Sequence, residues 1–243
     1  MIKKQVFVLA YEQTEAIVLR KVDFSESSRI VTFLTPCRGR LTCMAKGARR
    51  KGSPLATLLD TYNRLEITCA WKDSRQVQLL TEAALLDSYG ALKGNVESVV
   101  CAAFLLETAG LAAQENNPAP EIYNTLRAGL EQIAANPDTP FTHVVHGVFA
   151  VLEAAGFAPN TEDAFFAEQT RRLAQKERDA LHESIDALAS GGLPSEPERI
   201  FNIIRYLKSA VVYHFERPLK SYPFLESMFP NQECTQSGTL LRK

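Results

Sequence analysis

The residues best suited to chemistry in this chain are six cations that lie close together. They are Arg38, Arg40, Lys46, Arg49, Arg50 and Lys51, and residues 38–51 contain no Asp or Glu. Lys and Arg at this density neutralise phosphate groups and release their counterions. Two glycines in the same stretch, Gly47 and Gly52, let backbone N–H groups approach a phosphate closely. The alternative is a solvated charged surface without a ligand, and the missing acids favour a nucleic-acid site.

Charge is distributed unevenly along the 243 residues. Residues 1–90 contain 14 Lys and Arg against 9 Asp and Glu, a net charge of +5. Residues 91–243 contain 13 against 19, a net charge of −6. This asymmetry is expected when one part of a protein meets a polyanion and the other does not. The whole-chain net charge of −1 is therefore uninformative about a partner.

Composition and cysteine usage indicate the compartment. Hydrophobic residues make up 46% and charged residues 23% of the chain, as in a soluble globular protein. No stretch approaches the roughly 18 apolar residues that span a bilayer, and the apolar run near the start is too short for a secretory signal. The odd number of cysteines, five, and their scatter favour free thiols in a reducing compartment. We expect a cytoplasmic protein without membrane contact.

Metal binding and catalysis have little support. Cys37 and Cys43 are spaced too widely for a zinc pair, and a reducing compartment argues against a lasting disulfide if they face each other across a hairpin. His143 and His146 share one helix face but lack a third ligand. The sequence has no Walker-type loop, no Gly-x-Ser-x-Gly elbow and no two-metal carboxylate cluster. We expect no catalytic residue, no metal and no cofactor.

Aromatic side chains in the basic third are candidates for base stacking. Single-stranded nucleic acid is held both by cations and by bases stacked on aromatic rings. The candidates are Phe33, Tyr62 and Trp71. The alternative for each is packing in the core, which is the commoner role of an aromatic residue in a strand.

Strands must position these residues in the first third of the chain. Alternating and β-branched runs predict strands at 14–22, 29–35, 40–46, 61–71 and 75–82, with one brief helix near 55–59. Five short antiparallel strands with one helical connection fit a small barrel such as the OB-fold. Residues 1–12 are either a further strand or an extension.

From about Ala84 the apolar period becomes helical. The pattern predicts helices at 95–114, 121–135, 141–155, 164–188 and 195–213, separated by prolines and glycines. We predict an α+β protein with an N-terminal five-stranded OB-fold β-barrel at 1–83. An all-helical C-terminal domain follows at 84–232, and residues 233–243 form a flexible tail.

Several motifs resemble RecO, the bacterial recombination-mediator family. In the basic third they are residues 15–19 (Glu-Ala-Ile-Val-Leu), 25–27 (Ser-Glu-Ser) and 45–50 (Ala-Lys-Gly-Ala-Arg-Arg). In the helical part they are Gly156-Phe157 with Pro159, and residues 217–221 (Arg-Pro-Leu-Lys-Ser). The resemblance therefore reaches both halves of the chain, and the motifs at 45–50 and 217–221 together carry its specificity.

The resemblance implies a non-catalytic DNA-repair mediator. Such a protein binds single- and double-stranded DNA, anneals complementary strands, and works with RecR and usually RecF on strands coated by SSB so that RecA can load. The six cations of residues 38–51 would then bind the DNA backbone. Arg217 and Lys220 either add to this contact or pack the C-terminus against the barrel, which Pro218 and Leu219 favour. The alternatives are a protein-interaction adaptor whose barrel does not bind DNA, and a nuclease, for which no ligand set is present.

The chain departs from the family pattern at two places. Many relatives have a four-cysteine zinc site after the Gly-Phe-x-Pro motif, where this chain reads Asn-Thr-Glu-Asp at 160–163, so we expect no zinc. Relatives also tend to have Arg or Lys before an aromatic residue in the preceding helix, where this chain has Val-Val-His-Gly at 144–147. His146 would contact the acidic SSB tail only when protonated.

Overall fold

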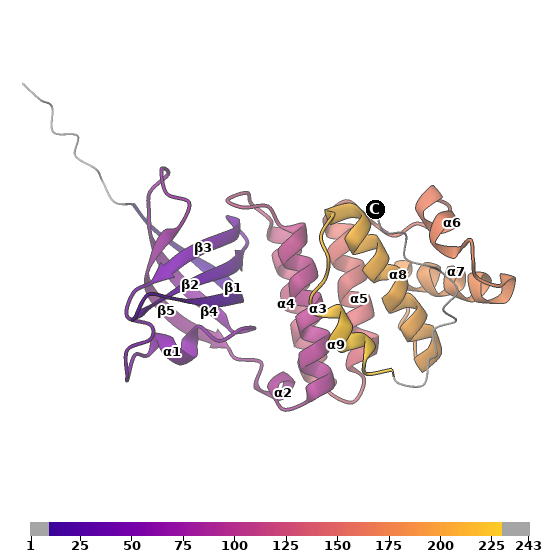
Figure 1. The fold of residues 1–243 in the computed structure, drawn as a ribbon, viewed down its shortest axis with the longest axis horizontal. Coiled ribbons are helices and arrows are strands. Elements are labelled where there is room, and N and C mark those ends of the chain that lie inside the picture. Colours follow the sequence, from indigo (N-terminus) through magenta and orange to yellow (C-terminus); the bar gives the residue numbers. More distant parts are fainter. Residues whose placement is uncertain (1–9, 230–243) are drawn as a thin grey trace, which may run out of the picture.

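A barrel followed by a helical domain makes up the computed structural model, which describes residues 10–229 (Figure 1). The strands are β1 (Ala10–Phe24), β2 (Ser28–Thr35), β3 (Gly39–Ala45), β4 (Arg64–Trp71) and β5 (Gln78–Asp87). They close into a barrel in the order β1–β2–β3–β5–β4, with β1 paired to β4. The pairing of β3 with β5 is parallel, and the other neighbours are antiparallel. The predicted α+β fold with an N-terminal five-stranded barrel is confirmed.

The barrel has an apolar interior because its strands alternate. Val31 and Phe33 on β2 and Cys43 on β3 point inward and are fully buried. Helix α1 (Leu55–Leu58) connects β3 to β4 and lies at one end of the barrel (Figure 1). Leu59, just after α1, is fully buried in the same cluster, so the connection closes that end with apolar side chains.

The helical domain is built around three long helices and a fourth that packs on them. The helices are α2 (Gly90–Lys93), α3 (Val96–Ala112), α4 (Pro120–Ala135), α5 (Pro140–Ala154), α6 (Ala164–Thr170), α7 (Gln175–Ala189), α8 (Pro197–Phe215) and α9 (Tyr222–Glu226). The Asn95 side chain caps α3 by accepting from the Ser98 N–H at 2.9 Å. Proline begins α4, α5 and α8, where the missing N–H costs nothing.

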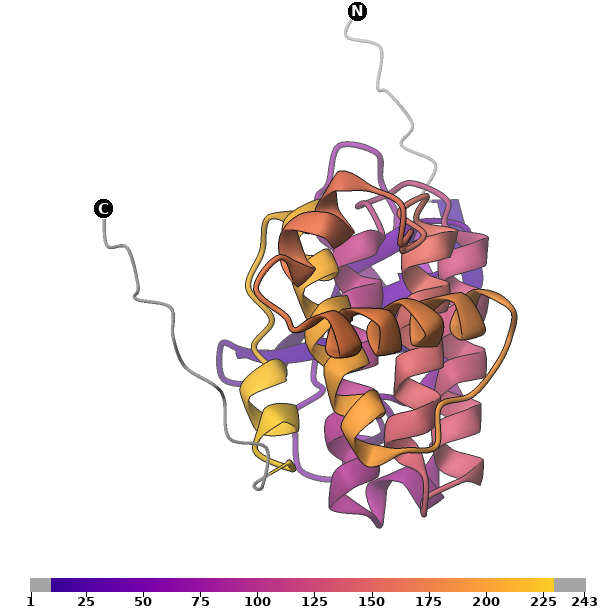
Figure 2. The same cartoon turned by 90° about the vertical axis from the view of Figure 1, so that its right-hand side faces the viewer.

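The single helix predicted at 164–188 is wrong, because the structure divides it into α6 and α7. Ala174 has extended backbone (φ −60°, ψ 153°), and its N–H donates to the Glu177 side chain at 3.1 Å, which starts α7. The Arg178 side chain donates to the Thr170 carbonyl at 3.3 Å and so links the two helices. Figure 2 shows α7 lying across α5 and α8 on the side away from the barrel. The change of direction between α6 and α7 depends on these contacts, which cannot be predicted from the spacing of apolar residues.

The barrel and the helices share one buried interface. Ile17 of β1 and Leu34 of β2 are fully buried in the hydrophobic cluster of the helical domain. The Tyr123 hydroxyl of α4 donates to the Glu15 carboxylate at 2.8 Å. β5 continues to Asp87, past the boundary expected at residue 83. The outer face of the barrel is therefore covered at this end.

Some expectations concern residues outside the described range. Residues 10–12 belong to β1, which begins at Ala10, and the rest of the segment 1–12 lies outside the described residues. The tail expected at 233–243 lies outside residues 10–229. Within residues 10–229, none of the helices combines the length and the apolar composition needed to cross a bilayer.

The turn between β2 and β3 fits tightly against the connection between α3 and α4. Gly39 has a φ of +55°, and a Cβ there would lie 2.3 Å from the Asn117 carbonyl oxygen and 2.5 Å from that of Gln114. The Arg40 N–H donates to the same Gln114 carbonyl at 2.9 Å. Only glycine allows both this backbone conformation and this approach.

We predict that Gly39→Ala lowers the free energy of unfolding more than Gly52→Ala, measured by urea denaturation. Gly52 has a φ of +78°, but a Cβ at this position would have no atom within 4 Å, so its variant bears only the cost of positive φ, about 1–2 kcal/mol. Gly39→Ala adds an overpacking cost of about 1–3 kcal/mol. Equal losses in the two variants would show that the contact with the α3–α4 connection is loose.

Candidate nucleic-acid interface

The loop that follows β3 carries most of the predicted cations and is a folded turn. Ala48 is fully buried in the barrel cluster and anchors the loop. The Arg50 N–H donates to the Gly47 carbonyl and the Ser53 N–H to the Arg50 carbonyl, both at 3.0 Å. Gly47 has a φ of +73°, which a turn of this shape requires. The basic loop, residues 46–52, therefore has a defined shape and a buried attachment point.

Arg49 holds this loop against the hairpin between β1 and β2. Its backbone N–H donates to the Ser27 carbonyl at 3.0 Å, and its Nη1 donates to the Ser25 carbonyl at 2.6 Å. Its Nε lies 3.2 Å from the Asp23 carboxylate, which also accepts from the Arg29 Nε at 3.0 Å. Sequence reasoning missed Asp23, because strand pairing and not proximity in the sequence brings this residue to Arg49. Arg49 thus attaches the basic loop to the β1–β2 hairpin.

Three cations of the basic loop are left facing solvent. Lys46, Arg50 and Lys51 are exposed, and their side chains make no hydrogen bond or ion pair with any residue between 10 and 229. Because each positive charge is uncompensated, an approaching anion meets no competing carboxylate on these side chains. We call these three residues the free cation group.

Arg38 and Arg40 lie at the opposite end of β3 and are engaged. Arg38 donates to both carboxylate oxygens of Glu12, at 3.0 and 2.5 Å, and its guanidinium lies 4.1 Å from the ring centre of Trp71. The hydrogen bond to Glu12 raises the pKa of Arg38 above its ordinary value. Arg40 donates to the Gly110 carbonyl at 3.2 Å and lies 3.5 Å from Glu115. The structure therefore does not bring these two residues together with the basic loop.

Arg217 and Lys220 lie in the connection between α8 and α9. Both are exposed, whereas Leu219 is buried in the helical cluster. The Lys220 and Ser221 N–H groups donate to the Glu107 carboxylate of α3, at 2.9 and 2.8 Å. The expectation that this segment packs against the barrel is wrong, because its buried contacts are with the helical domain.

The aromatic stacking candidates are occupied. Phe33 is fully buried in the barrel, so stacking by Phe33 is excluded. Tyr62 packs against the helical cluster, and its hydroxyl donates to the Val99 carbonyl at 3.3 Å. Trp71 is half-buried under Arg38, and its Nε1 donates to Asp73 at 2.7 Å. Phe33 is therefore excluded, and the side chains of Tyr62 and Trp71 already have intramolecular contacts.

The thiols form a different pair from the one considered from the sequence. Cys43 faces Cys69 inside the barrel with 3.3 Å between the sulfur atoms, whereas Cys37 is exposed in the β2–β3 turn. A facing pair of Cys37 and Cys43 is therefore wrong, because Cys43 points inward. The hydrogen bond with Cys69, followed by burial, raises the pKa of the Cys43 thiol, which keeps it protonated. Residues 10–229 contain no group of three or more His, Cys, Asp or Glu side chains able to hold a metal ion.

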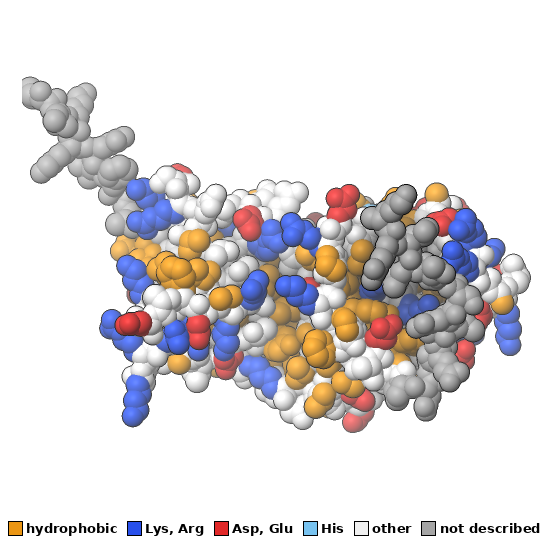
Figure 3. All heavy atoms as spheres, in the orientation of Figure 1, with side chains coloured by type: hydrophobic (Ala, Val, Ile, Leu, Met, Phe, Trp, Pro, Cys, Tyr) orange, Lys and Arg blue, Asp and Glu red, His pale blue; other side chains and the backbone are white. Residues whose placement is uncertain are grey.

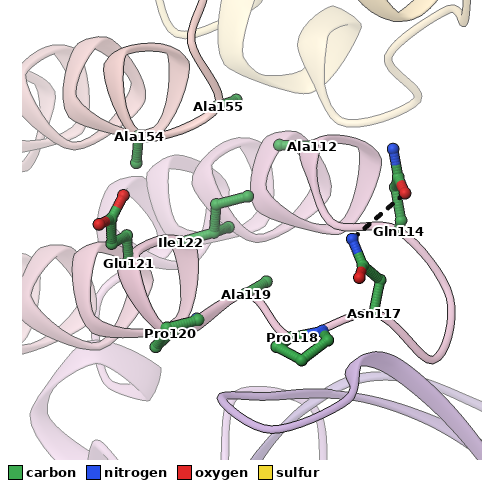
Figure 4. A pocket seen from close by; sticks show the side chains of 10 residues that line it. All are labelled: Ala112, Gln114, Asn117, Pro118, Ala119, Pro120, Glu121, Ile122, Ala154 and Ala155. Atoms are coloured by element: carbon green, nitrogen blue, oxygen red, sulfur yellow. Dashed lines mark hydrogen bonds between the residues drawn. The ribbon is translucent and has the colours of Figure 1, made fainter.

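An open hollow of about 370 Å³ lies between the α3–α4 connection and the end of α5 (Figure 4). Gln114 and Asn117 supply its amide groups and are hydrogen-bonded to each other at 3.3 Å. Glu121 supplies its ionisable group. The hollow adjoins the Gly39 end of β3, whereas the basic loop leaves from the other end, so the two are separate features.

Both halves of the chain are similar to known proteins. Residues 9–89 match the family model of the recombination protein O N terminal, and residues 94–181 match that of the recombination protein O C terminal. Among curated proteins, the DNA repair protein RecO of Anaeromyxobacter sp. strain K is 30% identical over 146 residues, covering 60% of this chain and 57% of that protein. The protein of the same name from Synechococcus sp. is 26% identical, with 92% of both chains covered. The chain thus spans little more than half the length of the Anaeromyxobacter relative.

Arg49 and Arg50 are adjacent in sequence but have different surroundings, which gives a matched test of the loop. We predict that Arg49→Ala speeds amide hydrogen exchange across residues 46–52, because side-chain contacts with the β1–β2 hairpin are lost. Arg50→Ala should leave exchange near that of the unaltered protein. Since exposed ion pairs contribute at most about 1 kcal/mol, global stability should change little in either variant. Equal exchange in both variants would contradict the positioning role of Arg49.

Proposed function

Because this chain belongs to the recombination protein O family, we propose that it acts in DNA repair and recombination by binding DNA through its N-terminal barrel. The observation that carries the proposal is the free cation group on a loop of defined shape. Lys46, Arg50 and Lys51 would contact phosphates, and binding would depend little on base sequence. Arg49 would hold the loop, and Arg38 and Arg40 would maintain the barrel and its junction with the helices.

The proposed role is that of a mediator without a chemical step. Cations that neutralise two phosphate backbones at once reduce the repulsion between complementary strands, so we propose that the protein anneals them. We further propose that it binds both single- and double-stranded DNA and works with RecR, and usually RecF, on SSB-coated strands so that RecA can load. Tethering these proteins on one DNA strand would raise their local concentrations.

A contact between α5 and the acidic SSB tail is a further part of this proposal. His146 is exposed on α5, whereas Val145 and Gly147 on either side of it are buried. A protonated imidazole at this position would attract a carboxylate, and a neutral one would not. The proposed contact therefore requires the protonated form of the His146 side chain.

We predict that replacing Lys46, Arg50 and Lys51 together by Ala weakens binding to a fluorescently labelled single strand in anisotropy titrations. Each phosphate contact on a single strand contributes about 0.7 to the slope of log affinity against log salt. The slope should therefore fall by about 2 in the variant, and strands of different sequence should lose affinity equally.

The matched control removes three cations from the other end of the molecule. Arg171, Arg172 and Lys176 are exposed around the junction of α6 and α7, far from the barrel in Figure 1. Replacing them by Ala changes the net charge by the same amount and should leave the slope nearly unaltered. Equal effects of the two triple variants would point to overall charge. Absence of DNA binding at low salt would support the adaptor whose barrel binds a protein.

Annealing gives an independent readout. We predict that the unaltered protein speeds the pairing of two complementary labelled strands, measured by fluorescence quenching, and that the Lys46, Arg50, Lys51 variant does so less, in proportion to its lost affinity. The control variant of the α6–α7 junction should retain the acceleration. A binding-deficient variant that anneals at the full rate would separate annealing from this loop.

A further inference from the structure

The outer surface of the barrel carries a row of apolar side chains across four neighbouring strands. Val22 of β1 lies opposite Ile30 of β2, Ile30 lies opposite Met44 of β3, and Met44 is in register with Leu79 of β5. Residues directly opposite each other in neighbouring strands lie on the same face of the sheet. The four side chains therefore form one continuous strip, which we call the apolar strip.

Burial shows that the apolar strip faces outward. Val31 and Cys43, the sequence neighbours of Ile30 and Met44, are fully buried in the barrel interior. Because side chains alternate along a strand, Ile30 and Met44 must point to the opposite side. Val22 is 43% exposed, although it is an apolar residue within a strand. Figure 3 shows that the barrel half of the molecule carries both hydrophobic and basic side chains on the face in view.

Phe24 extends the apolar strip toward the basic loop. It lies two residues after Val22 on β1, opposite Ser28, and therefore on the same outer face. Its side chain is 46% exposed. The residues on either side of Phe24 both bind the Arg49 side chain. Asp23 forms an ion pair with it, and the Ser25 carbonyl accepts a hydrogen bond from it. The contacts that hold the basic loop thus also set Phe24 beside it.

The charges around the strip favour an anionic ligand. Lys46 comes directly after β3, two residues beyond Met44, and Arg20 precedes Val22 by two residues on the outer face of β1. Neither side chain has an ion-pair partner among the residues that the structure describes. Of the two acids in the β1–β2 hairpin, Asp23 is compensated by Arg29 and Arg49, and Glu26 is exposed and without an ion-pair partner among the described residues, so the free cations Arg20 and Lys46 outnumber it. An apolar face with one exposed ring and free cations at its edges matches a ligand that has both flat apolar groups and a polyanionic backbone.

We propose that the apolar strip and Phe24 are the base-contacting part of a single-stranded nucleic-acid site, an inference that rests on the DNA binding proposed above. Phe24 stacks on one base, and the aliphatic side chains contact the neighbouring bases. Lys46 and the rest of the free cation group hold the phosphates. In a duplex the faces of the bases are already stacked, so this contact is available to single strands and not to double strands. The strip thereby supplies a preference for single strands that the cations alone do not supply.

Phe24→Ala tests this inference, with Tyr11→Ala as its matched control. Tyr11 is an aromatic residue near the other end of the same strand, is 65% exposed, and is not part of the strip. Stacking of one base on an aromatic ring corresponds to about fivefold or more in affinity. In anisotropy titrations, we expect Phe24→Ala to lose at least this factor for a labelled single strand, to change duplex binding by less than about twofold, and to keep the salt slope. Tyr11→Ala should bind both like the unaltered protein.

Phe24→Leu separates stacking from packing, because leucine retains apolar bulk without a ring. Under the proposal it loses single-strand affinity as Phe24→Ala does, while thermal unfolding stays close to that of the unaltered protein. Full single-strand binding by Phe24→Ala, or recovery by Phe24→Leu, would overturn the proposal. If that happens while the Lys46, Arg50, Lys51 variant still loses binding and salt slope, DNA binding by the basic loop stands and only the stacking surface is refuted.

Discussion

The pairing of β3 with β5 is the contact on which the arrangement of the rest of the barrel depends. It joins residues 43–45 to residues 78–80 in parallel. Without this contact the sheet would have two open edges with unpaired backbone groups. With it, the last residues of β3 are held by main-chain hydrogen bonds, and the chain leaves the barrel at Lys46 from a fixed point. The position of the basic loop is therefore decided by barrel closure, and the charges are placed as a consequence.

β3 also separates two kinds of arginine. At the start of β3, Arg38 binds the Glu12 carboxylate, and Arg40 donates to the Gly110 carbonyl of α3. At its last end, Asp23 accepts one arginine of the loop, and the remaining cations stay free. The energy of each exposed pair is small, so the acids act mainly by selecting which charges remain available. A surface with few but uncompensated cations attracts a polyanion more effectively than one with many paired cations.

The helical domain determines which part of the barrel is open. Ile17 and Leu34 belong to the barrel strands but are buried in the helical cluster. The tight approach at Gly39 fixes the same end against the α3–α4 connection. The other end of the β1–β2 hairpin, with Val22 and Phe24, is left exposed. The division into a covered end and an open end gives the barrel one side for intramolecular contact and another for a ligand.

Local pattern was enough to predict the five strands, the long helices and the location of the basic run, because a strand or helix of this length carries its period within its own residues. The motifs of the family were also readable in both halves. The break between α6 and α7 could not be predicted in this way, because the chain turns there through the extended backbone of Ala174 and the hydrogen bond from Arg178 to the Thr170 carbonyl.

Contacts between residues distant in the sequence likewise decide which cations of residues 38–51 have partners and which remain free. Arg38 meets Glu12 and Arg49 meets Ser25, residues 26 and 24 positions away in the chain, and nothing local distinguishes Arg49 from Arg50. Phe33 was one of three stacking candidates with core packing as the alternative, and the alternation of β2 turns it into the core, whereas the exposed Phe24 was not among the candidates. These contacts depend on the register in which distant strands pair, and that register cannot be read directly from a single sequence.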